Sequence, residues 1–434
     1  MRFVPAVFLA AALGTACTVN VPLTGKRCAM TEPRCLPGFE CVDDFCVPVG
    51  SAPGDGGAED DAGFTCASDR DPLASACAGS DWFLAQNGND ANDGRSSATP
   101  RRTLMPASVN GGDRIHLLGR WTVDPQLASL SGTASCPVII TGEADGGTVL
   151  TAKNDLGGSN VVWTRMTVAP SGDLDSFELI NAGRFITFHE VTFTGGPVTN
   201  GQYPYFIRLE PAARCDDCTV RNCTFLTGAQ RVVTVDGSNF SFLGNRVVLR
   251  EGPNIESGGA NSRIEGNDFS GAFNDFVVRI DSGTVAFNVF HHIEVIFPNK
   301  VMLTATNARV TRNTFTQIED DNPGAPLVEA MRFDNNLISA ANRVVAGAPP
   351  PGGDWNVFST DVPLPYFASD GGVFGTDRRA SVDFEPGFVP LAGSVAIDGA
   401  DPTLPVPQGG GLRGDVGAVE RGAQRISTGT YCPP

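Results

Sequence analysis

The chain of 434 residues has no apolar run long enough to cross a bilayer. Its leading run, from Val4 to Leu13, falls well short of the roughly 20 residues that a spanning helix needs. Positive charge is also scarce, because 31 Lys and Arg residues face 48 Asp and Glu residues and give a formal net charge of −17. This deficit argues against binding nucleic acid through bulk electrostatics and leaves room only for a local basic groove.

Tryptophan and tyrosine are rare as well, with 4 of each, whereas the chain contains 27 Phe, 51 Gly and 31 Pro. Frequent Gly and Pro punctuate many short elements, so this composition favours short strands and turns over long helices. With 41% hydrophobic and 18% charged residues, the chain is globular in class and long enough for a large core.

The first residues have the pattern of an export signal. Met1-Arg2 and the apolar run precede Gly14-Thr-Ala-Cys17. A small-residue triplet before Cys resembles the bacterial lipoprotein signal, which implies that residues 1–17 are a signal peptide with its lipobox and that Cys17 is acylated. Ordinary secretion is the alternative, with Cys17 in a disulfide. We therefore expect a protein anchored by lipid at the outer membrane or cell surface, or secreted.

Twelve cysteines in an exported chain predict disulfides, formed in an oxidising compartment. Four crowd into residues 18–49, a piece too small for a core: Cys28, Cys35, Cys41 and Cys46. They allow three pairings, and a zinc site is disfavoured because paired Cys-x-x-Cys and a nearby His are missing. The piece resembles Cys-rich modules near the N-termini of myxobacterial lipoproteins. If Cys17 is acylated, eleven cysteines remain, so one thiol is free or the lipobox interpretation is wrong.

Composition also divides the rest of the chain. Residues 50–64 are small, acidic and nearly free of apolar side chains, so they predict a flexible linker. The main domain is expected over 65–422, followed by a tail over 423–434. Near its start, Cys66 and Cys77 are expected to close a local loop.

A short phrase recurs in the main domain with a period of about 22 residues: apolar, two residues, Asn, one residue, apolar. Copies centre on Asn245, Asn267, Asn288 and Asn313, continue at Asn336 and Asn356, and begin with Val191 and Cys223 in the Asn position. Units this short cannot bury their own apolar residues, so they predict a solenoid. We expect each Asn at a tight bend, bonded to backbone and stacked on the Asn of adjacent coils.

The flanks of the repeats extend this interpretation. A strand, a turn-rich loop, a short helical cap and a second strand fit Trp82–Gly94, Pro100–Leu104 and Gly112–Gly119, and a closing segment fits Ala396–Pro402 and Leu412–Glu420. Together these segments resemble the two ends of right-handed parallel β-helix proteins of the pectate-lyase-like superfamily, over roughly residues 80–422. The resemblance implies an all-β, single-stranded right-handed parallel β-helix of about ten coils with an N-terminal cap.

A second strand precedes each bend phrase and predicts a polar outer stripe, because strand side chains alternate in direction. The residues expected inside are Ile207, Leu209, Val233, Val235, Ile255, Val278, Ile280, Val301 and Leu303. Those expected outside are Arg208, Glu210, Thr234, Asp236, Asn254, Glu256, Arg279, Asp281 and Thr304. Lys300, one of three lysines, borders the stripe.

Enzymes of the resembled superfamily carry polysaccharide along the corresponding sheet, which implies a ligand-binding role for Arg208, Glu210, Asp236, Glu256 and Asp281. A lyase needs Ca²⁺ or Arg on the uronate carboxylate and a base for the C5 proton. Asp236, Glu256 and Asp281 are then the calcium ligands, Lys300 or Arg279 the base, and Arg208 the carboxylate partner. A hydrolase needs two carboxylates, for which Asp236 and Asp281 are candidates. A solubilising ion-pair ladder explains the same pattern, and these positions match no catalytic motif.

Two further clusters contain side chains that bind metals or form disulfides. His291 and His292 are adjacent and are expected to point apart, so a metal site there needs carboxylates from another coil. His116 and His189 are expected to be packed or surface residues. Cys215-Asp-Asp-Cys218 lacks the context of a redox motif and predicts a disulfide that ties a loop to the next coil, with Cys223 paired or packed inside. Cys136 and Cys432 are left for other loops or each other.

The leading hypothesis is a cell-surface module that binds carbohydrate or another extended ligand on the polar stripe. A calcium-assisted polysaccharide lyase is the first alternative, with a glycoside hydrolase less favoured. A structural surface protein without a ligand is the second.

Overall fold

The computed structural model divides the chain into two compact units, residues 1–61 and 62–434. It describes the backbone of 39–42 and 45–48, and it describes residues 77–417 outside these gaps: 105–107, 128, 144–145, 152–157, 170–183, 195–204, 210–214, 227–230, 251–254, 274, 297–299, 321–327, 342–344, 347–355, 360–377, 386–387, 393 and 398–415.

The first unit contains an antiparallel hairpin of β1 (Phe39–Val42) and β2 (Phe45–Pro48). Its register places Cys41 opposite Cys46. Several predictions concern residues outside the described part of the chain: the signal peptide with Cys17 and its acylation, the linker, and Cys28, Cys35 and Cys66.

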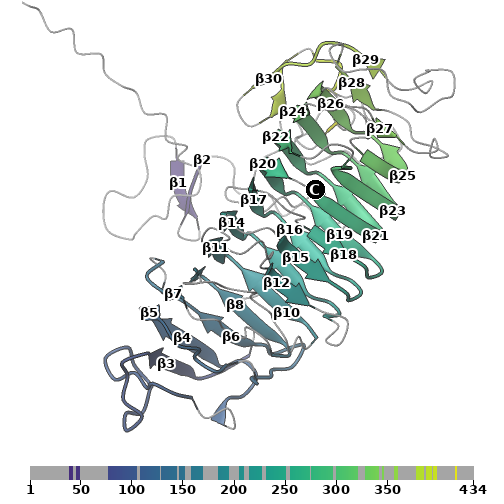
Figure 1. Cartoon of the computed structure of the whole chain (residues 1–434). Helices are drawn as coiled ribbons and strands as arrows, with labels where there is room; N and C mark the ends of the chain where they lie inside the picture. Colours follow the sequence, from purple (N-terminus) through teal and green to yellow (C-terminus); the bar gives the residue numbers. More distant parts are fainter. Residues whose placement is uncertain are drawn as a thin grey trace, which may run out of the picture. The chain divides into compact units, whose positions relative to one another are not determined.

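Parallel strands of the second unit stack along one axis and form three faces (Figure 1). The first sheet contains β12 (Tyr205–Leu209), β15 (Arg231–Val235), β18 (Ile255–Ser257), β21 (Val278–Ala286), β23 (Leu303–Thr311), β25 (Val328–Asp334) and β27 (Val345–Ala346). The second contains β3 (Asp81–Ala85), β4 (Arg114–Leu118), β6 (Val138–Thr141), β8 (Val161–Thr164), β10 (Ile186–His189), β13 (Thr219–Arg221), β16 (Ser241–Leu243) and β19 (Ser262–Glu265). It continues into the C-terminal halves of β21, β23 and β25, which join the two faces.

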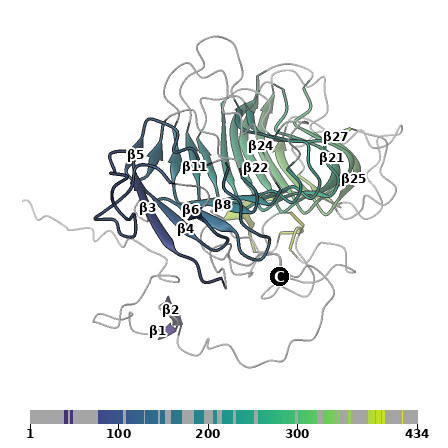
Figure 2. The same ribbon diagram turned by 90° about the horizontal axis from the view of Figure 1, so that it is seen from below.

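The third sheet is continuous over 12 strands: β5 (Arg120–Trp121), β7 (Val149–Leu150), β9 (Thr167–Val168), β11 (Thr192–Thr194), β14 (Thr224–Leu226), β17 (Arg246–Arg250), β20 (Asp268–Phe273), β22 (Val289–Val295), β24 (Thr314–Asp320), β26 (Leu337–Ala341), β28 (Val357–Phe358) and β29 (Arg378–Arg379). Seen from below, β11, β22 and β24 of this sheet stand apart from β4, β6 and β8 of the second (Figure 2).

The all-β parallel β-helix that the repeats predict is therefore confirmed. The coil number differs slightly from the expected ten, because within the described residues about seven turns, from β12 to β27, carry a strand of the first sheet. Earlier coils have described strands on the second and third faces alone. The described residues contain no α-helix, so the described part of the expected helical cap is not helical. Among these residues, no helix is long and apolar enough to cross a membrane.

The recurring Asn residues form one buried ladder along the bend between the second and third sheets. Asn288 shows the pattern: its Nδ2 donates to the Ile264 carbonyl (2.7 Å) and to Asn313 Oδ1 (2.9 Å), and its Oδ1 accepts from the backbone N–H (2.9 Å) and Nδ2 (2.8 Å) of Asn267. Side-chain bonds of 2.8–3.3 Å continue through Asn245, Asn267, Asn288, Asn313, Asn336 and Asn356. The predicted structural role of these residues is confirmed.

The residue before Asn245, Asn267, Asn288 and Asn313 has a left-handed backbone conformation in each case. Gly244 and Gly266 hold this position at φ 61° and 66° without steric cost, because they have no Cβ. Phe287 and Arg312 hold it at φ 57° and 52°. The Asn hydrogen bonds recur in every one of these coils, so the ladder rather than the preceding residue fixes the bend.

The core is a set of apolar columns that run along the axis. One column on the third sheet is mostly aromatic, and Phe193 stacks on Phe225 at 4.8 Å between ring centroids. Phe290 stacks at 4.9 Å on both Phe269 and Phe315. These rings are fully buried, so the Phe-rich composition is explained by stacking of aromatic residues in register between coils.

C-terminal residues cover part of the outer face of the third sheet. Leu337 and Val357 of β26 and β28 form a separate buried cluster with Val382, Ala396 and Val416. A short antiparallel pair, β30 (Phe384–Glu385) and β31 (Val389–Pro390), lies within this segment. The cover explains how apolar residues can occupy the outer face of β26 and β28.

Candidate functional site

The first sheet presents the polar residues that alternation predicts for its outer face. Backbone register aligns Arg208, Thr234, Glu256, Arg279, Thr304 and Glu329 across six strands, and we call this set the polar row. The residues that precede four members of this row point inward and are fully buried: Val233, Ile255, Val278 and Leu303. The predicted alignment is therefore observed.

Some stripe positions depart from the expectation. Val301 precedes β23 and is half-buried, so it does not belong to the inner column. Glu210 and Asn254 lie outside the described residues. Glu329 extends the row by one coil beyond the residues expected from sequence. The sequence signal for Glu329 is the alternation of Val328, Glu329 and Ala330. It lies beyond the last strand for which the sequence predicted an outer residue, which ends at Thr304.

Two aspartates flank a glycine one step beyond the polar row. Asp236 follows β15, Asp281 lies in β21, and Gly258 follows the intervening strand β18. A Cβ atom on Gly258 would lie 2.7 Å from Asp236 Oδ1 and 3.9 Å from Asp281 Oδ2. Both carboxylates therefore border one exposed gap, which exists because residue 258 has no side chain.

Glu256 and Arg279 face each other in adjacent coils. Glu256 Oε1 lies 3.2 Å from Arg279 Nη1, and the Arg279 guanidinium lies 4.0 Å from the centroid of the Phe276 ring. Both charged side chains are partly exposed, so the ion pair contributes about 1 kcal/mol or less. The contacts hold Arg279 in place and keep its charge compensated.

Lys300 is also paired. Its Nζ lies 2.9 Å from Asp275 Oδ1, at the edge of the first sheet where β21 and β23 begin. Both predicted bases, Lys300 and Arg279, therefore have carboxylate partners, and their catalytic role stays a prediction.

The three predicted calcium ligands do not converge. Glu256 belongs to the polar row and is paired with Arg279, whereas Asp236 and Asp281 flank Gly258 two residues further along their strands. Across the described part of the chain, no group of three or more His, Cys, Asp or Glu side chains is arranged to hold a metal. Calcium prefers six to eight oxygen ligands. The role of Asp236, Glu256 and Asp281 as calcium ligands therefore stays a prediction.

Comparison with known proteins finds similarity to solved structures alone. No family model matches the chain, and no curated protein matches it. Among solved structures, it is similar to pectate lyase Pel9A, with 16% identity over 80% of this chain and 98% of that chain and a TM-score of 0.43. It is also similar to the GH136 lacto-N-biosidase from Eubacterium ramulus (11% identity, 69% and 68% covered, TM-score 0.40) and to the PL6 family alginate lyase AlyGC (12%, 82% and 59%, TM-score 0.39).

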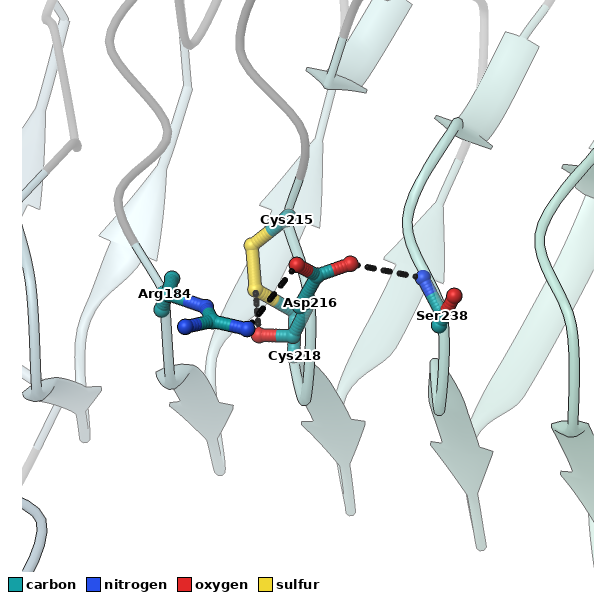
Figure 3. The surroundings of a disulfide bond; sticks show 5 residues. All are labelled: Arg184, Cys215, Asp216, Cys218 and Ser238. Atoms are coloured by element: carbon teal, nitrogen blue, oxygen red, sulfur yellow. Dashed lines mark hydrogen bonds and ion pairs between the residues drawn. A yellow bond between two sulfur atoms is a disulfide. The ribbon is translucent and has the colours of Figure 1, made fainter.

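The cysteines that the structure describes in the second unit are structural. Cys215 and Cys218 form a disulfide, as predicted, but it closes a single turn instead of tying a loop to the next coil. Figure 3 shows Asp216 beside it, where Arg184 Nη2 donates to Oδ2 (3.3 Å) and the Ser238 N–H donates to Oδ1 (3.0 Å). Asp216 rather than the disulfide therefore links the adjacent coils, and burial of both sulfur-bearing residues argues against redox exchange.

Two other cysteine predictions have different outcomes. Cys77 pairs with Cys136 across 59 residues, so the expected Cys66–Cys77 loop is wrong. Spacing favoured the nearer cysteine, but stacking brings the segments before β3 and β6 together. Cys223 is a free, buried thiol that takes the Asn position at the start of the ladder, as predicted for a residue packed inside. Burial raises the pKa of this thiol to about 12.

The two adjacent histidines do not point apart. In the pairing of β20 with β22, Ser270 faces His291 and Gly271 faces Ile293, so His292 is an extra residue in a bulge, at φ 47°. The two Nδ1 atoms lie 2.8 Å apart. His291 Nε2 lies 2.6 Å from Asp268 Oδ1. The expectation failed because a bulge breaks the alternation of a regular strand.

Proposed function

We propose that this protein binds an extended, uncharged carbohydrate along the outer face of its first sheet. The observation that carries the proposal is the polar row together with the gap that Asp236 and Asp281 border over Gly258. Carboxylates accept hydrogen bonds from sugar hydroxyls, and a row of such groups repeated every coil matches a ligand that is itself a linear repeat.

The charge of the face favours a neutral glycan over a uronate. The guanidinium of Arg279 is compensated by Glu256, and Asp236, Asp281 and Glu329 add negative charge without a basic partner among the contacts that the structure gives for them. A carboxylated sugar placed over Gly258 would meet two like charges, which costs free energy. Hydroxyl groups meet no such penalty.

Affinity electrophoresis of the folded chain in gels that contain neutral polysaccharides tests the binding. We expect at least one of xylan, β-glucan, galactomannan and arabinan to retard the protein. The Gly258→Ala variant should lose most of the retardation, because its methyl group occupies the gap 2.7 Å from Asp236 Oδ1. Arg263→Ala is the matched control, since Arg263 also pairs with a glutamate, Glu265, but on the second sheet.

Retardation that Gly258→Ala leaves unchanged would contradict this binding site. A lack of retardation in every gel would contradict carbohydrate binding altogether and favour a structural surface protein.

A glycoside hydrolase is the second candidate, and the placement of Asp236 and Asp281 within 4 Å of one point favours it. Two carboxylates on either side of a scissile bond are the chemical requirement for this reaction. Release of reducing sugar from a polysaccharide that binds, abolished in Asp236→Asn, would establish hydrolysis. Binding without release keeps the first proposal.

The lyase alternative has a separate readout. Incubation with pectate, alginate or glycosaminoglycan and Ca²⁺ generates an unsaturated product that absorbs ultraviolet light if β-elimination occurs. We expect no absorbance change, because Lys300 and Arg279 both have carboxylate partners.

We further propose that the chain is exported and held at the cell surface through Cys17. The lipobox-like sequence motivates this, and the disulfides Cys77–Cys136 and Cys215–Cys218 support an oxidising compartment. In a bacterial host, the protein should partition into the membrane fraction, and Cys17→Ala should release it. A Cys17→Ala variant that stays in the membrane fraction would contradict the anchor.

A further inference from the structure

The His291–His292 pair on the third sheet is built unlike the other histidines of the chain. There are 4 histidines in the sequence, and His116 resembles His291 in one respect, because its Nε2 lies 2.9 Å from Asp81 Oδ1. His116 stacks on Phe83, with 4.5 Å between ring centroids, and has no second imidazole beside it among its described contacts. At 291–292, the bulge brings two ring nitrogens to one point.

We propose that the Nδ1 atoms of His291 and His292 bind one divalent transition-metal ion, with Zn²⁺ as the ion that suits the site. Imidazole nitrogen is a preferred ligand of Zn²⁺, Cu²⁺ and Ni²⁺. Two nitrogens that share a tetrahedral metal at about 2.0–2.1 Å lie roughly 3.3 Å apart, so the 2.8 Å separation must open by roughly 0.5 Å.

Asp268 holds His291 in the orientation that metal binding requires. His291 Nε2 donates to Asp268 Oδ1 at 2.6 Å, which leaves the Nδ1 lone pair free to face His292. Metal-bound histidines commonly donate their second ring N–H to a carboxylate in this way. Phe388 packs on the other side of the His291 ring at 4.5 Å between centroids, so the ring is fixed from two directions.

The proton between the two rings can move to another nitrogen of His292, which leaves the charge of the histidine pair unchanged. In the hydrogen-bonded state, His292 Nδ1–H donates to His291 Nδ1, because Asp268 takes the other N–H of His291. When the metal binds, His292 carries its proton on Nε2 instead. His292 is exposed, so water can carry the proton from one nitrogen to the other.

The next coil offers a third ligand. In the pairing of β22 with β24, Thr316 faces His291 and Ile318 faces Ile293, so Gln317 lies level with His292 without a register shift. Gln317 is exposed and has φ 53°, and its side-chain oxygen would be the third metal ligand. Glu294 and Glu319 are exposed and aligned nearby, and their charge attracts cations. Two imidazoles and one neutral oxygen predict micromolar rather than nanomolar affinity.

Calorimetric titration of the intact, disulfide-bonded chain with ZnCl₂ tests the site. We expect one equivalent to bind. His292→Asn should weaken binding at least tenfold, and Asn is chosen because it tolerates the left-handed backbone of a bulge. Asp268→Asn should weaken it roughly tenfold, within the range found for such outer partners. His116→Ala is the matched control and should bind as the unaltered chain does.

Electron paramagnetic resonance of the Cu²⁺-loaded chain separates ligands from positioning residues. The unaltered chain and Asp268→Asn should both show hyperfine coupling to two nitrogens, whereas His292→Asn should show fewer. Absence of Zn²⁺ binding at millimolar concentration, or equal affinity in His292→Asn, overturns the proposal. Circular dichroism of each variant checks that the fold is retained.

Discussion

At the scale of single residues, the Asn ladder shows how a repeated polar side chain stabilises a fold whose coils share no covalent link at the bend. Each ladder Asn gives two donors and one acceptor to buried groups of its own or adjacent coils. A buried group that loses its partner costs about 1–3 kcal/mol. An apolar residue of similar size cannot replace a ladder Asn, because it would leave these buried groups without hydrogen-bond partners.

Asn288→Ala is predicted to lower the free energy of unfolding by about 3–5 kcal/mol, because the Asn267 N–H and Nδ2 and the Ile264 carbonyl lose their bonds to the Asn288 side chain. Asn313 Oδ1 loses one of its two donors and keeps the Asn288 backbone N–H. Denaturant unfolding followed by circular dichroism measures the change. The control is Asn307→Ala, an exposed position in β23, which should change stability by less than about 0.5 kcal/mol. Equal effects at both positions would contradict the role of the ladder.

Cys223 predicts a pH dependence of stability. Its pKa is about 12 in the folded chain because burial disfavours the thiolate, against an ordinary value of 9.0. A pKa raised by folding stabilises fully below the unfolded value, so this contribution is present below pH 9 and is lost between pH 9 and 12. At about pH 10.5 the loss relative to neutral pH should be about 2 kcal/mol.

The comparison with Cys223→Ser isolates this effect from other groups that titrate in the same range. The difference in unfolding free energy between the two chains should shift by about 2 kcal/mol between about pH 7.5 and pH 10.5. An unchanged difference would mean that the thiol is accessible in the folded chain.

The residue scale also shows what sequence could and could not predict. The Asn positions were predictable because the side chain recurs with the coil period, and Cys223 fitted the same slot by spacing. The convergence of His291 and His292 was not predictable, because it depends on one extra residue in β22 relative to β20. A bulge leaves no signal in the spacing of apolar residues.

At the scale of elements, the strands of the first sheet were placed correctly because alternation of buried and outer residues fixes their register. Contacts between distant elements were less predictable. The covering of β26 and β28 by Val382, Ala396 and Val416 depends on how the chain returns along the solenoid. The Cys77–Cys136 pairing depends on which coil edges stack, and sequence distance favoured Cys66 instead.

Reduction should affect the two disulfides described in the second unit unequally. Loss of Cys77–Cys136 releases a loop of 59 residues, for which the chain-entropy model gives about 4 kcal/mol. Loss of Cys215–Cys218, which spans 3 residues, gives about 1.6 kcal/mol by the same model. Hydrogen exchange in Cys77→Ala/Cys136→Ala should accelerate in β3, β4 and β6 and stay slow in β20, β22 and β24.

The matched variant Cys215→Ala/Cys218→Ala should leave exchange in β3, β4 and β6 unchanged. Acceleration throughout the solenoid after loss of Cys77–Cys136 would show that the coils unfold as one unit instead of from the N-terminal end.

At the scale of the whole molecule, charge selects among ligands that the polar face could hold. The chain has a net charge of −17, and Asp236, Asp281 and Glu329 place negative charge close to any ligand on the outer face of the first sheet. Long-range repulsion of an anionic chain acts over the Debye length, about 8 Å at physiological ionic strength, and falls as salt is added. A neutral chain experiences neither effect.

This difference gives a prediction that does not depend on knowing the sugar. Affinity for a neutral polysaccharide should be nearly constant between about 0.02 and 0.5 M NaCl, whereas any weak retention by pectate or alginate should strengthen as salt screens the repulsion. Affinity electrophoresis at several salt concentrations measures both. Binding to pectate that weakens steeply with salt would instead mean that a local basic groove outweighs the net charge, and Arg208 and Arg279 would then be the residues to substitute first, because they are the cations of the polar row.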